Sequence, residues 1–441
     1  MVEIARRAVA PSRRRARHAD LTATPPVVTP AVPEAAAPTP LVPEPAAPTP
    51  EESPAPHVVP FTRTRICPEA RQAVADVLES GWVTSGQQVV EFEAELAAYV
   101  GAEHGIAVSS CTAAIELALR AMDLPEGSKV LMSTVTFCGA AAAIRHAGHV
   151  PVLADVDPVT AMPSPATAAA AAAGCGGVDA LVVVHLAGLP TDVRALAEAA
   201  GVDLDHVVED AAHALGTVVG DEPVGTISRA TCFSFYATKN LAIGEGGMVT
   251  TDDPDLALRM RRARLHGMSA DAWRRYLPGG GWRYDVDAEG LKANMTDVQA
   301  AIGRAQLRRF DLDQARRAAV AARYDEGLSG IPGLRRPPRP VTGRHAWHLY
   351  TVRVEPAYGM ERDELIDVLR ARGVCTSVHF IPLHQLTWFR DHCIVPAEGL
   401  PGADRVFDRI LSLPMDAVIT DAEVDQVCSA LADRARRGAR G

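Results

Sequence analysis

A lysine, an aspartate and a histidine are the residues of this sequence that could combine in one reactive site. Lys239 lies in a glycine-containing loop between two β-rich runs, residues 231–235 and 247–251. Asp210 closes an apolar run, and His213 follows three residues later. A lone loop lysine is usually a solvated charge, so its significance depends on this upstream pair. An amine, a carboxylate and an imidazole that meet at strand ends suit a pyridine cofactor.

These residue types match the chemical needs of pyridoxal phosphate. That cofactor needs an amine to hold its aldehyde covalently, a carboxylate to keep its ring nitrogen protonated, and groups that cradle its phosphate. Lys239, Asp210 and Ser234 could supply the amine, the carboxylate and a phosphate-binding hydroxyl. We therefore expect pyridoxal 5′-phosphate as the cofactor, with Lys239 and Asp210 as the catalytic residues.

Three segments resemble a known family. They read Ser-Phe-Tyr-Ala-Thr-Lys-Asn-Leu (234–241), Glu-Asp-Ala-Ala-His-Ala-Leu-Gly (209–216) and Asn-Met-Thr-Asp-Val-Gln-Ala-Ala-Ile-Gly (294–303). In order and spacing they are similar to the sugar aminotransferases of the DegT/DnrJ/EryC1/StrS family, from about Pro60 to the C-terminus. The resemblance implies the aspartate aminotransferase fold type I and transamination of a nucleotide-linked keto-sugar, with glutamate as amino donor. It also implies a homodimer.

The resemblance implies further cofactor contacts. Thr112 and Ala113 belong to a strand-to-helix segment, residues 109–114, whose backbone N–H groups and helix dipole would face the phosphate. An ordinary serine N-cap would explain the same segment. Cys111 stands where the family usually has glycine. Phe137 is expected to lie against the pyridine ring, although a phenylalanine at such a position is more often simply core.

Two more contacts follow from the same resemblance. His213 is expected to touch the ring or its phenolic oxygen, and Asn294 to reach the phosphate of the neighbouring subunit. The active site would then be shared between the two subunits. Asn294 or Thr296 could also cap the helix that follows, and both interpretations can hold together.

Other segments resemble those that line the substrate side in this family: residues 82–86, 266–268, Trp282, His348 and 379–384. His379 and His384 could also be interpreted as metal ligands. No third ligand stands at a suitable spacing, so we expect no metal site.

The composition argues against several classes of function. The 441 residues carry 44 Lys and Arg against 54 Asp and Glu, a net charge of −10 without a long basic stripe, so nucleic acid is not an expected partner. The eight cysteines form neither a Cys-x-x-Cys pair nor a regular framework, which fits a reducing cytoplasm. No apolar run reaches the roughly 18 to 20 residues of a membrane span. The expected partners are small-molecule substrates and a second copy of the chain.

The pattern of elements predicts an α/β fold. Residues 1–56 hold an arginine cluster and a Pro/Ala-rich repeat, so we expect a disordered extension. Seven β-rich runs follow, at 106–109, 129–132, 150–154, 181–184, 206–209, 231–235 and 247–251. Most of them are separated by helical patterns, which predicts a largely parallel seven-stranded sheet covered on both faces. Ligands of such sheets bind beyond the carboxyl ends of the strands. The polar residues at these ends are Ser110, His185, Asp210 and Lys239.

The C-terminal half predicts a second, smaller unit. A Gly- and Trp-rich stretch, 273–282, precedes one long helix over 296–328. Strands are expected at 347–354 and 374–380, and helices at 361–372, 403–411 and 421–435. We therefore divide the chain into a large cofactor-binding domain, 57–320, and a small α+β domain, 321–441, with the boundary inside the long helix.

Several alternatives share this fold or this family. A sugar dehydratase of the family would carry histidine in place of Lys239. A cysteine desulfurase would need an activated cysteine on a mobile loop, for which Cys393 is the candidate. A non-catalytic regulator would carry a DNA-binding domain, and the Pro/Ala-rich extension has no helix-turn-helix pattern. A keto-cyclitol in place of the sugar stays open.

Overall fold

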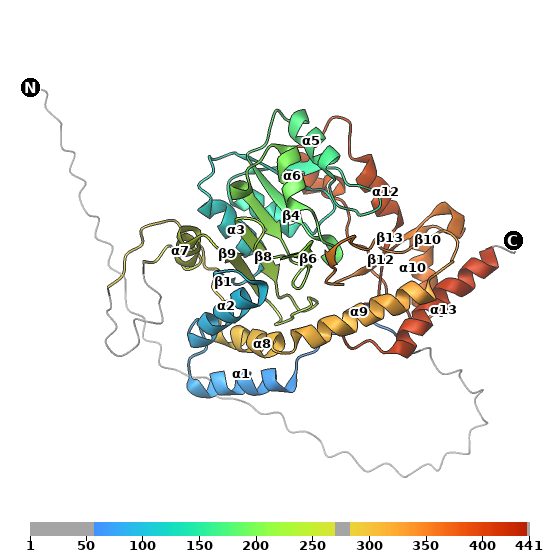
Figure 1. Ribbon diagram of the computed structural model, residues 1–441, viewed down its shortest axis with the longest axis horizontal. Coiled ribbons are helices and arrows are strands. Elements are labelled where there is room, and N and C mark those ends of the chain that lie inside the picture. The colour runs from blue at the N-terminus through green and yellow to red at the C-terminus, as the bar shows by residue number, and fades with distance from the viewer. Residues whose placement is uncertain (1–56, 270–282, 439–441) are drawn as a thin grey trace, which may run out of the picture. The chain divides into compact units, whose positions relative to one another are not determined.

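The computed structural model describes residues 57–269 and 283–438. Its central element is a seven-stranded sheet in the order β1-β9-β8-β5-β4-β2-β3 (Figure 1). The strands are β1 (His104–Val108), β2 (Lys129–Ser133), β3 (Val150–Ala154), β4 (Ala180–Val184), β5 (Val207–Asp210), β8 (Ala230–Ser234) and β9 (Gly247–Thr251). β3, β2, β4, β5 and β8 run parallel, and β9 lies antiparallel between β8 and β1. The predicted largely parallel sheet is confirmed, and each strand begins within two residues of its predicted start.

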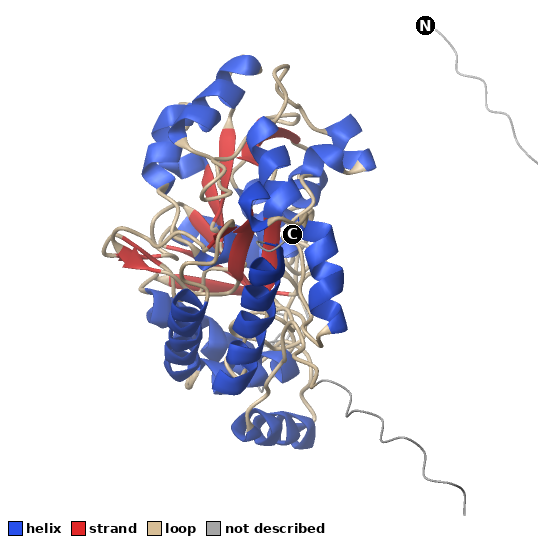
Figure 2. Cartoon of the chain, turned by 90° about the vertical axis from the view of Figure 1, so that its right-hand side faces the viewer, coloured by secondary structure: helices blue, strands red, loops and turns tan. Residues whose placement is uncertain are grey.

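Helices cover both faces of this sheet (Figure 2). One buried core joins the sheet to α3 (Cys111–Ala121), α4 (Gly139–His146) and α7 (Pro254–Ala263). A second core joins the other face to α2 (Gln87–Val100), α5 (Pro165–Gly174) and α6 (Val193–Ala200). Because both faces are buried, the strands read as nearly continuous apolar runs. The alanine-rich α5 was not predicted, since alanine on every face leaves little apolar periodicity.

The predicted long helix is wrong, because the chain forms two helices there. α8 (Asp297–Leu307) packs on α1 (Pro68–Ser80) and α2, whereas α9 (Phe310–Gly327) packs on α13 (Asp421–Gly438) (Figure 1). The break falls at Arg308 and Arg309, where Arg309 N–H bonds back only to Gln306 O. Phe310 is anchored in the second core against Tyr99. Each helix thus follows its own packing partners, and no Gly or Pro marks the change.

The C-terminal residues form a separate core. Val320 and Tyr324 of α9 belong to it, and it surrounds a three-stranded sheet of β10 (Leu334–Arg335), β12 (Tyr350–Val354) and β13 (Ile410–Leu413). The helices of this part are α10 (Arg362–Ala371), α11 (Thr387–His392), α12 (Pro401–Arg409) and α13. We keep the division of the chain near residue 320 as a proposal.

One prediction in this part is wrong, and one predicted helix ends two residues early. Residues 374–380 form only isolated bridges, Val374 to Val59 and Ser377 to Ser412, because each meets its partner strand at a single residue. The helix expected over 403–411 ends at Arg409, and the residues from Ile410 continue into β13. A third small sheet, β11 (Gly343–Arg344), β6 (Val218–Val219) and β7 (Glu222–Pro223), was not predicted because its strands have two residues each.

The extension at 1–56 and the stretch 273–282, with Trp282, lie outside the described residues. Among the helices that the structure describes, none is long and apolar enough to cross a bilayer.

Candidate active site

A cavity of about 460 Å³ opens beyond the carboxyl ends of β5 and β8. Its walls come from the start of α3, the segment between β2 and α4, the ends of these strands and the loop before β9. His348 and residues 379–380 complete them. Six of the residues predicted for the site line it together: Lys239, Asp210, His213, Ser234, Thr112 and Phe137. These residues span more than 120 positions of the sequence, and the parallel sheet brings them together.

Lys239 stands in this cavity with an unusually acidic ammonium group. Burial lowers the pKa of Lys239 from its usual 10.5 to about 8, although the charge of Asp210 acts in the opposite direction. The backbone N–H of Lys239 donates to Tyr236 O at 2.8 Å, which fixes the loop. A substantial fraction of the amine is therefore unprotonated near neutral pH, as a nucleophilic amine requires.

Asp210 ends β5 at the floor of the cavity. Burial raises the pKa of its carboxyl, while the N–H of Ala212 and the charge of Lys239 partly offset that effect. Oδ1 accepts the Ala212 N–H at 3.1 Å and lies 3.8 Å from Sγ of Cys111. Burial and the nearby Asp210 raise the pKa of the Cys111 thiol well above its ordinary value, so it stays a weak S–H donor.

His213 faces the cavity as a neutral imidazole of one tautomer. Its Nδ1 accepts the backbone N–H of Ala187 at 3.2 Å, so the ring proton must be on Nε2. Burial, helped by the charge of Lys239, lowers the pKa of His213 well below its usual value. The ring lies parallel to Phe380, with the centroids 6.0 Å apart. Nε2 of His213 is therefore a hydrogen-bond donor.

The start of α3 presents backbone N–H groups to the same cavity. Ser110 Oγ caps the helix by accepting the N–H of Ala113 at 3.1 Å, while Cys111 and Thr112 line the cavity. Helix geometry leaves the N–H groups of such first-turn residues without an intrahelical partner. Ala113 itself is not among the lining residues. The predicted N-cap and the predicted anion-binding turn are therefore compatible here.

Close backbone packing holds this helix end in place. Gly247, the first residue of β9, lies so near α3 that a Cβ there would be 2.5 Å from the carbonyl carbon of Ser110. Ser234, at the end of β8, lines the cavity on the same side of the sheet. An amine, a buried carboxylate, a hydroxyl and a helix N-terminus therefore fit pyridoxal phosphate, and the cavity has room for it and for a substrate.

Phe137 is a cavity residue and not a core residue. Its side chain is 61% exposed, and its ring centroid lies 6.1 Å from that of Phe380. An aromatic ring this exposed at a cavity wall offers a free face for stacking. The simpler interpretation of Phe137 as buried core is wrong.

Asn294 does not line the cavity of its own chain. Its Nδ2 donates to Ser85 Oγ at 2.7 Å, and Nζ of Lys292 donates to its Oδ1. Thr296 caps α8 in a capping box with Gln299, so the cap belongs to Thr296 and not to Asn294. The expected contact of Asn294 with a neighbouring subunit stays a prediction.

The other histidines divide into two groups. His348 and His379 line the cavity, but His185 points away from it and bonds Glu209. His379 bonds Ser412 Oγ. His384 bonds Thr134 and Asp404, and the described residues hold no cluster of three metal-ligating side chains.

Asn240 is a residue that sequence reasoning missed. Its Nδ2 donates to Gln314 Oε1 and Ala346 O, so its Oδ1 must accept from Nδ1 of His348, 3.0 Å away. Nε2 of His348 is then an acceptor, and the centroid of its ring lies 4.3 Å from that of His213. Only the position of Asn240 next to Lys239 could have pointed to it.

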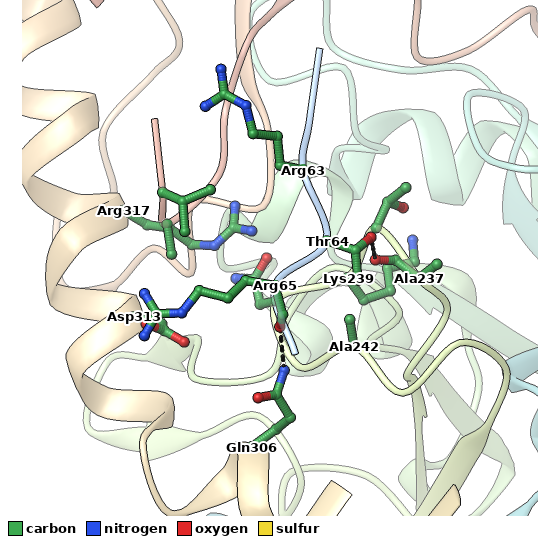
Figure 3. A pocket seen from close by; sticks show the side chains of 13 residues that line it. Arg63, Thr64, Arg65, Ala237, Lys239, Ala242, Gln306, Asp313 and Arg317 are labelled. Atoms are coloured by element: carbon green, nitrogen blue, oxygen red, sulfur yellow. Dashed lines mark hydrogen bonds between the residues drawn. The ribbon is translucent and has the colours of Figure 1, made fainter. Parts of the chain in front are cut away.

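A small polar pocket of about 30 Å³ lies beside the loop that carries Lys239 (Figure 3). It is lined by Arg63, Arg65 and Arg317, of which Arg63 pairs with Glu423 and Arg317 donates to Trp347 O. Burial lowers the pKa of Arg317 to about 10. Lys239 and its loop thus line both the large cavity and this arginine-rich pocket.

Comparison with known proteins agrees with this geometry. The model of the DegT/DnrJ/EryC1/StrS aminotransferase family matches residues 65–432. The chain is 44% identical over 379 residues to the spore coat polysaccharide biosynthesis protein SpsC of Bacillus subtilis, covering 86% of this chain and 97% of SpsC.

Solved structures agree as well. Spr1654 from Streptococcus pneumoniae, in its PLP form, is 28% identical with a TM-score of 0.78, covering 87% of this chain and 100% of Spr1654. DesI, solved in the presence of its TDP-sugar product, is 32% identical with a TM-score of 0.75, covering 88% of this chain and 94% of DesI.

Proposed function

Because this chain belongs to the DegT/DnrJ/EryC1/StrS family of pyridoxal-phosphate-dependent aminotransferases, we propose that it converts a nucleotide-linked keto-sugar to an amino sugar. Glutamate is the proposed amino donor. The cavity that brings Lys239 and Asp210 together carries this proposal, since it holds an acidified amine and a buried carboxylate in one place.

Two residues carry the chemistry. When bound, pyridoxal phosphate supplies an electron-accepting ring that stabilises negative charge on the neighbouring substrate carbon. Nζ of Lys239 holds the cofactor covalently at rest. During the reaction the same atom takes up and returns the proton of the substrate carbon, for which a pKa of about 8 is suitable. Asp210 keeps a proton on the ring nitrogen through its buried carboxylate.

The remaining predicted residues bind and orient the cofactor. Ser234 and the backbone N–H of Thr112 bind the phosphate at the start of α3, whereas the predicted Ala113 does not line the cavity and donates its N–H to Ser110 Oγ. Phe137 lies against the ring, and Nε2–H of His213 donates to the ring or its phenolic oxygen.

The shared site is a further part of the proposal. Asn294 lies outside its own cavity, which is compatible with a role in the neighbouring subunit's phosphate site. A homodimer in which each subunit completes its partner's site follows from that assignment. A cytoplasmic location is a separate part of the proposal.

The cavity supports a sugar as the acceptor. Besides His213, it is lined by His348 and His379, and burial lowers the pKa of His379 to about 4 and that of His348 well below its usual value. Neutral imidazoles offer hydrogen bonds that sugar hydroxyls can use. SpsC belongs by its name to polysaccharide biosynthesis, and DesI is solved with a TDP-sugar product.

Competing chemistry fits less well. A family dehydratase would need histidine where Lys239 stands. Cys393 does not line the cavity, and burial raises the pKa of its thiol to about 11, the opposite of what a desulfurase nucleophile needs.

Half-reaction spectroscopy tests the proposal. The aminated holoenzyme is mixed with a panel of nucleotide keto-sugars and keto-cyclitols, and the return of the near-visible absorbance of the lysine-linked cofactor is followed. A nucleotide keto-sugar should restore the band fastest. A response to cyclitols alone would replace the sugar assignment, and no response at all would remove the proposed acceptor class. Glutamate should convert the enzyme back to the aminated form faster than other amino acids.

A further inference from the structure

A buried carboxylate lies directly beside Asp210 on the other face of the sheet. Side chains alternate along β5, so Val208 and Asp210 face the α3 side, while Val207 and Glu209 face the α2 side. Glu209 and His185 are both fully buried, and neither lines the cofactor cavity. The proposed reaction gives neither of them a task.

Glu209 ties three neighbouring strands together. Its Oε2 accepts from Nε2 of His185, which follows β4, at 2.8 Å. Its Oε1 accepts the N–H and hydroxyl of Ser228 at 3.1 and 2.8 Å, and the hydroxyl of Thr231 on β8 at 3.0 Å. Four donors therefore converge on one carboxylate at the level where β4 and β5 end and β8 begins.

These bonds fix which nitrogen of His185 donates, and they keep Glu209 ionised. Nδ1 of His185 accepts the backbone N–H of Thr191 at 3.2 Å, so Nε2 carries the proton that bonds Glu209. Burial acts to raise the pKa of Glu209, but the hydrogen bond and the electrostatic attraction of His185, with the hydrogen bonds from Ser228 and Thr231, outweigh it and hold the pKa below its usual value. Glu209 is therefore an ionised carboxylate that His185 holds through Nε2.

The pair connects directly to the cofactor side of the sheet. The backbone N–H of His185 donates to the carbonyl of Asp210 at 3.2 Å, so the same residue binds Glu209 and Asp210. Ala187, two residues further, donates its N–H to Nδ1 of His213. A change in the Glu209–His185 contact therefore reaches both cofactor-facing side chains through one short segment.

We propose that Glu209 and His185 are positioning residues that hold the Asp210 carboxylate in register with the ring nitrogen of the cofactor. This inference rests on the role proposed for Asp210. In Glu209→Gln, an NH2 group replaces one of the two acceptor oxygens. At least one of the four donors then faces another donor and loses its hydrogen bond. The segment that orients Asp210 then loses its anchor, although no cofactor contact is removed.

The test compares two cofactors that differ only at the ring nitrogen. Dissociation constants are measured for pyridoxal phosphate and for the analogue with C–H in place of that nitrogen, because only the natural cofactor uses Asp210. Glu209→Gln should weaken binding of the natural cofactor by about 10-fold or more and bind the analogue nearly as wild type does. Equal weakening of both would overturn the inference and leave a purely structural role.

A matched control separates this effect from lost stability. Glu93→Gln also removes a buried carboxylate. Glu93 bonds Ala107 N–H and Arg264, and none of the three lines the cavity, so this variant should lower the melting temperature without selecting between the cofactors. If Glu209→Gln fails to fold, Thr231→Val removes only one of the four donors and should shift the ratio of the two constants by about 3-fold in the same direction. No shift in that variant would equally overturn the inference.

Two further measurements distinguish the failure of each claim. Asp210→Asn should bind pyridoxal phosphate no better than the analogue. If Asp210→Asn still prefers pyridoxal phosphate, the role of Asp210 and this inference are both wrong. If Asp210→Asn loses the preference but the Glu209 and Thr231 variants keep it, only the positioning role is wrong. Nitrogen-15 NMR of the imidazoles should show His185 with its proton on Nε2 and an unprotonated Nδ1. A proton on Nδ1 would contradict the hydrogen-bond assignment on which the inference rests.

Discussion

The amine of Lys239 has a pKa of about 8 because the cavity walls remove it from water, and this property can be measured directly. At pH 7.5 about a quarter of such an amine is unprotonated, against roughly 0.1% for an ordinary lysine. Only the unprotonated form can attack the aldehyde of the cofactor. The rate at which the apoprotein captures pyridoxal phosphate should therefore rise with pH and level off above about pH 8.

Stopped-flow absorbance at pH 6 to 11 measures this rate. The sign follows from burial, which disfavours the charged amine and so moves its pKa down. A capture rate that still rises between pH 9 and 10.5 would mean that the reactive amine is an unperturbed lysine.

Asp210→Asn tests the second catalytic residue. The amide keeps the shape of the side chain but cannot hold a proton on the ring nitrogen, so cofactor should still bind while turnover falls at least about 100-fold. Steady-state kinetics on saturated holoenzyme measure the loss. Turnover within a few-fold of wild type would remove Asp210 from the mechanism.

For individual residues, the sequence allowed chemical roles to be predicted but not hydrogen-bond partners. Lys239 and Asp210 stand in short segments whose chemistry is recognisable. The contact of Cys111 with Asp210 and the bond of Asn240 to His348 join residues about 100 positions apart. No local pattern encodes such contacts, because they exist only after the sheet has formed.

Phosphate binding is proposed to depend on the backbone at the start of α3. Gly247→Ala places a Cβ 2.5 Å from the carbonyl carbon of Ser110 and 2.7 Å from the nitrogen of Cys111. The backbone of α3 must then shift, so cofactor affinity should fall about 10-fold or more. Fluorescence titration of the apoprotein measures this, with Gly174→Ala as the control because its Cβ would meet nothing within 4 Å. Unchanged affinity in Gly247→Ala would show that the helix start does not bind the phosphate.

The elements themselves were predictable where burial imposes a pattern. The strands of the large sheet are buried on both faces, so apolar runs and intervening helices revealed them. The break between α8 and α9 at Arg308 and Arg309 was not predictable, since both residues favour helix. The new helix direction depends on tertiary packing, including that of Phe310 in the second core. The segment 374–380 has strand-like residues but meets its partners one residue at a time.

A shared site is a property of the whole molecule and has its own test. If Asn294 serves the neighbouring subunit, Lys239→Ala and Asn294→Ala damage different sites in a mixed dimer. One site then receives both intact residues, so mixing two impaired variants should restore up to about a quarter of wild-type activity. Activity after co-refolding, with mixed dimers confirmed by native mass spectrometry, measures the effect. Mixed dimers without any gain would assign Asn294 to its own subunit or to no site.

The most direct test of the central claim, that the cavity around Lys239 is where the cofactor is bound, is to fix the cofactor chemically to its lysine. The chain has only three lysines, Lys129, Lys239 and Lys292. Lys129 donates to Cys175 O at the start of β2, and Lys292 donates to Asn294, so each of the three reports a different place in the fold. Borohydride reduction of the holoenzyme followed by peptide mass spectrometry should place the added mass on the Lys239 peptide, in wild type and in Lys129→Arg alike, and nowhere in Lys239→Ala. Added mass on the Lys129 or Lys292 peptide, or fixation that persists in Lys239→Ala, would contradict the account.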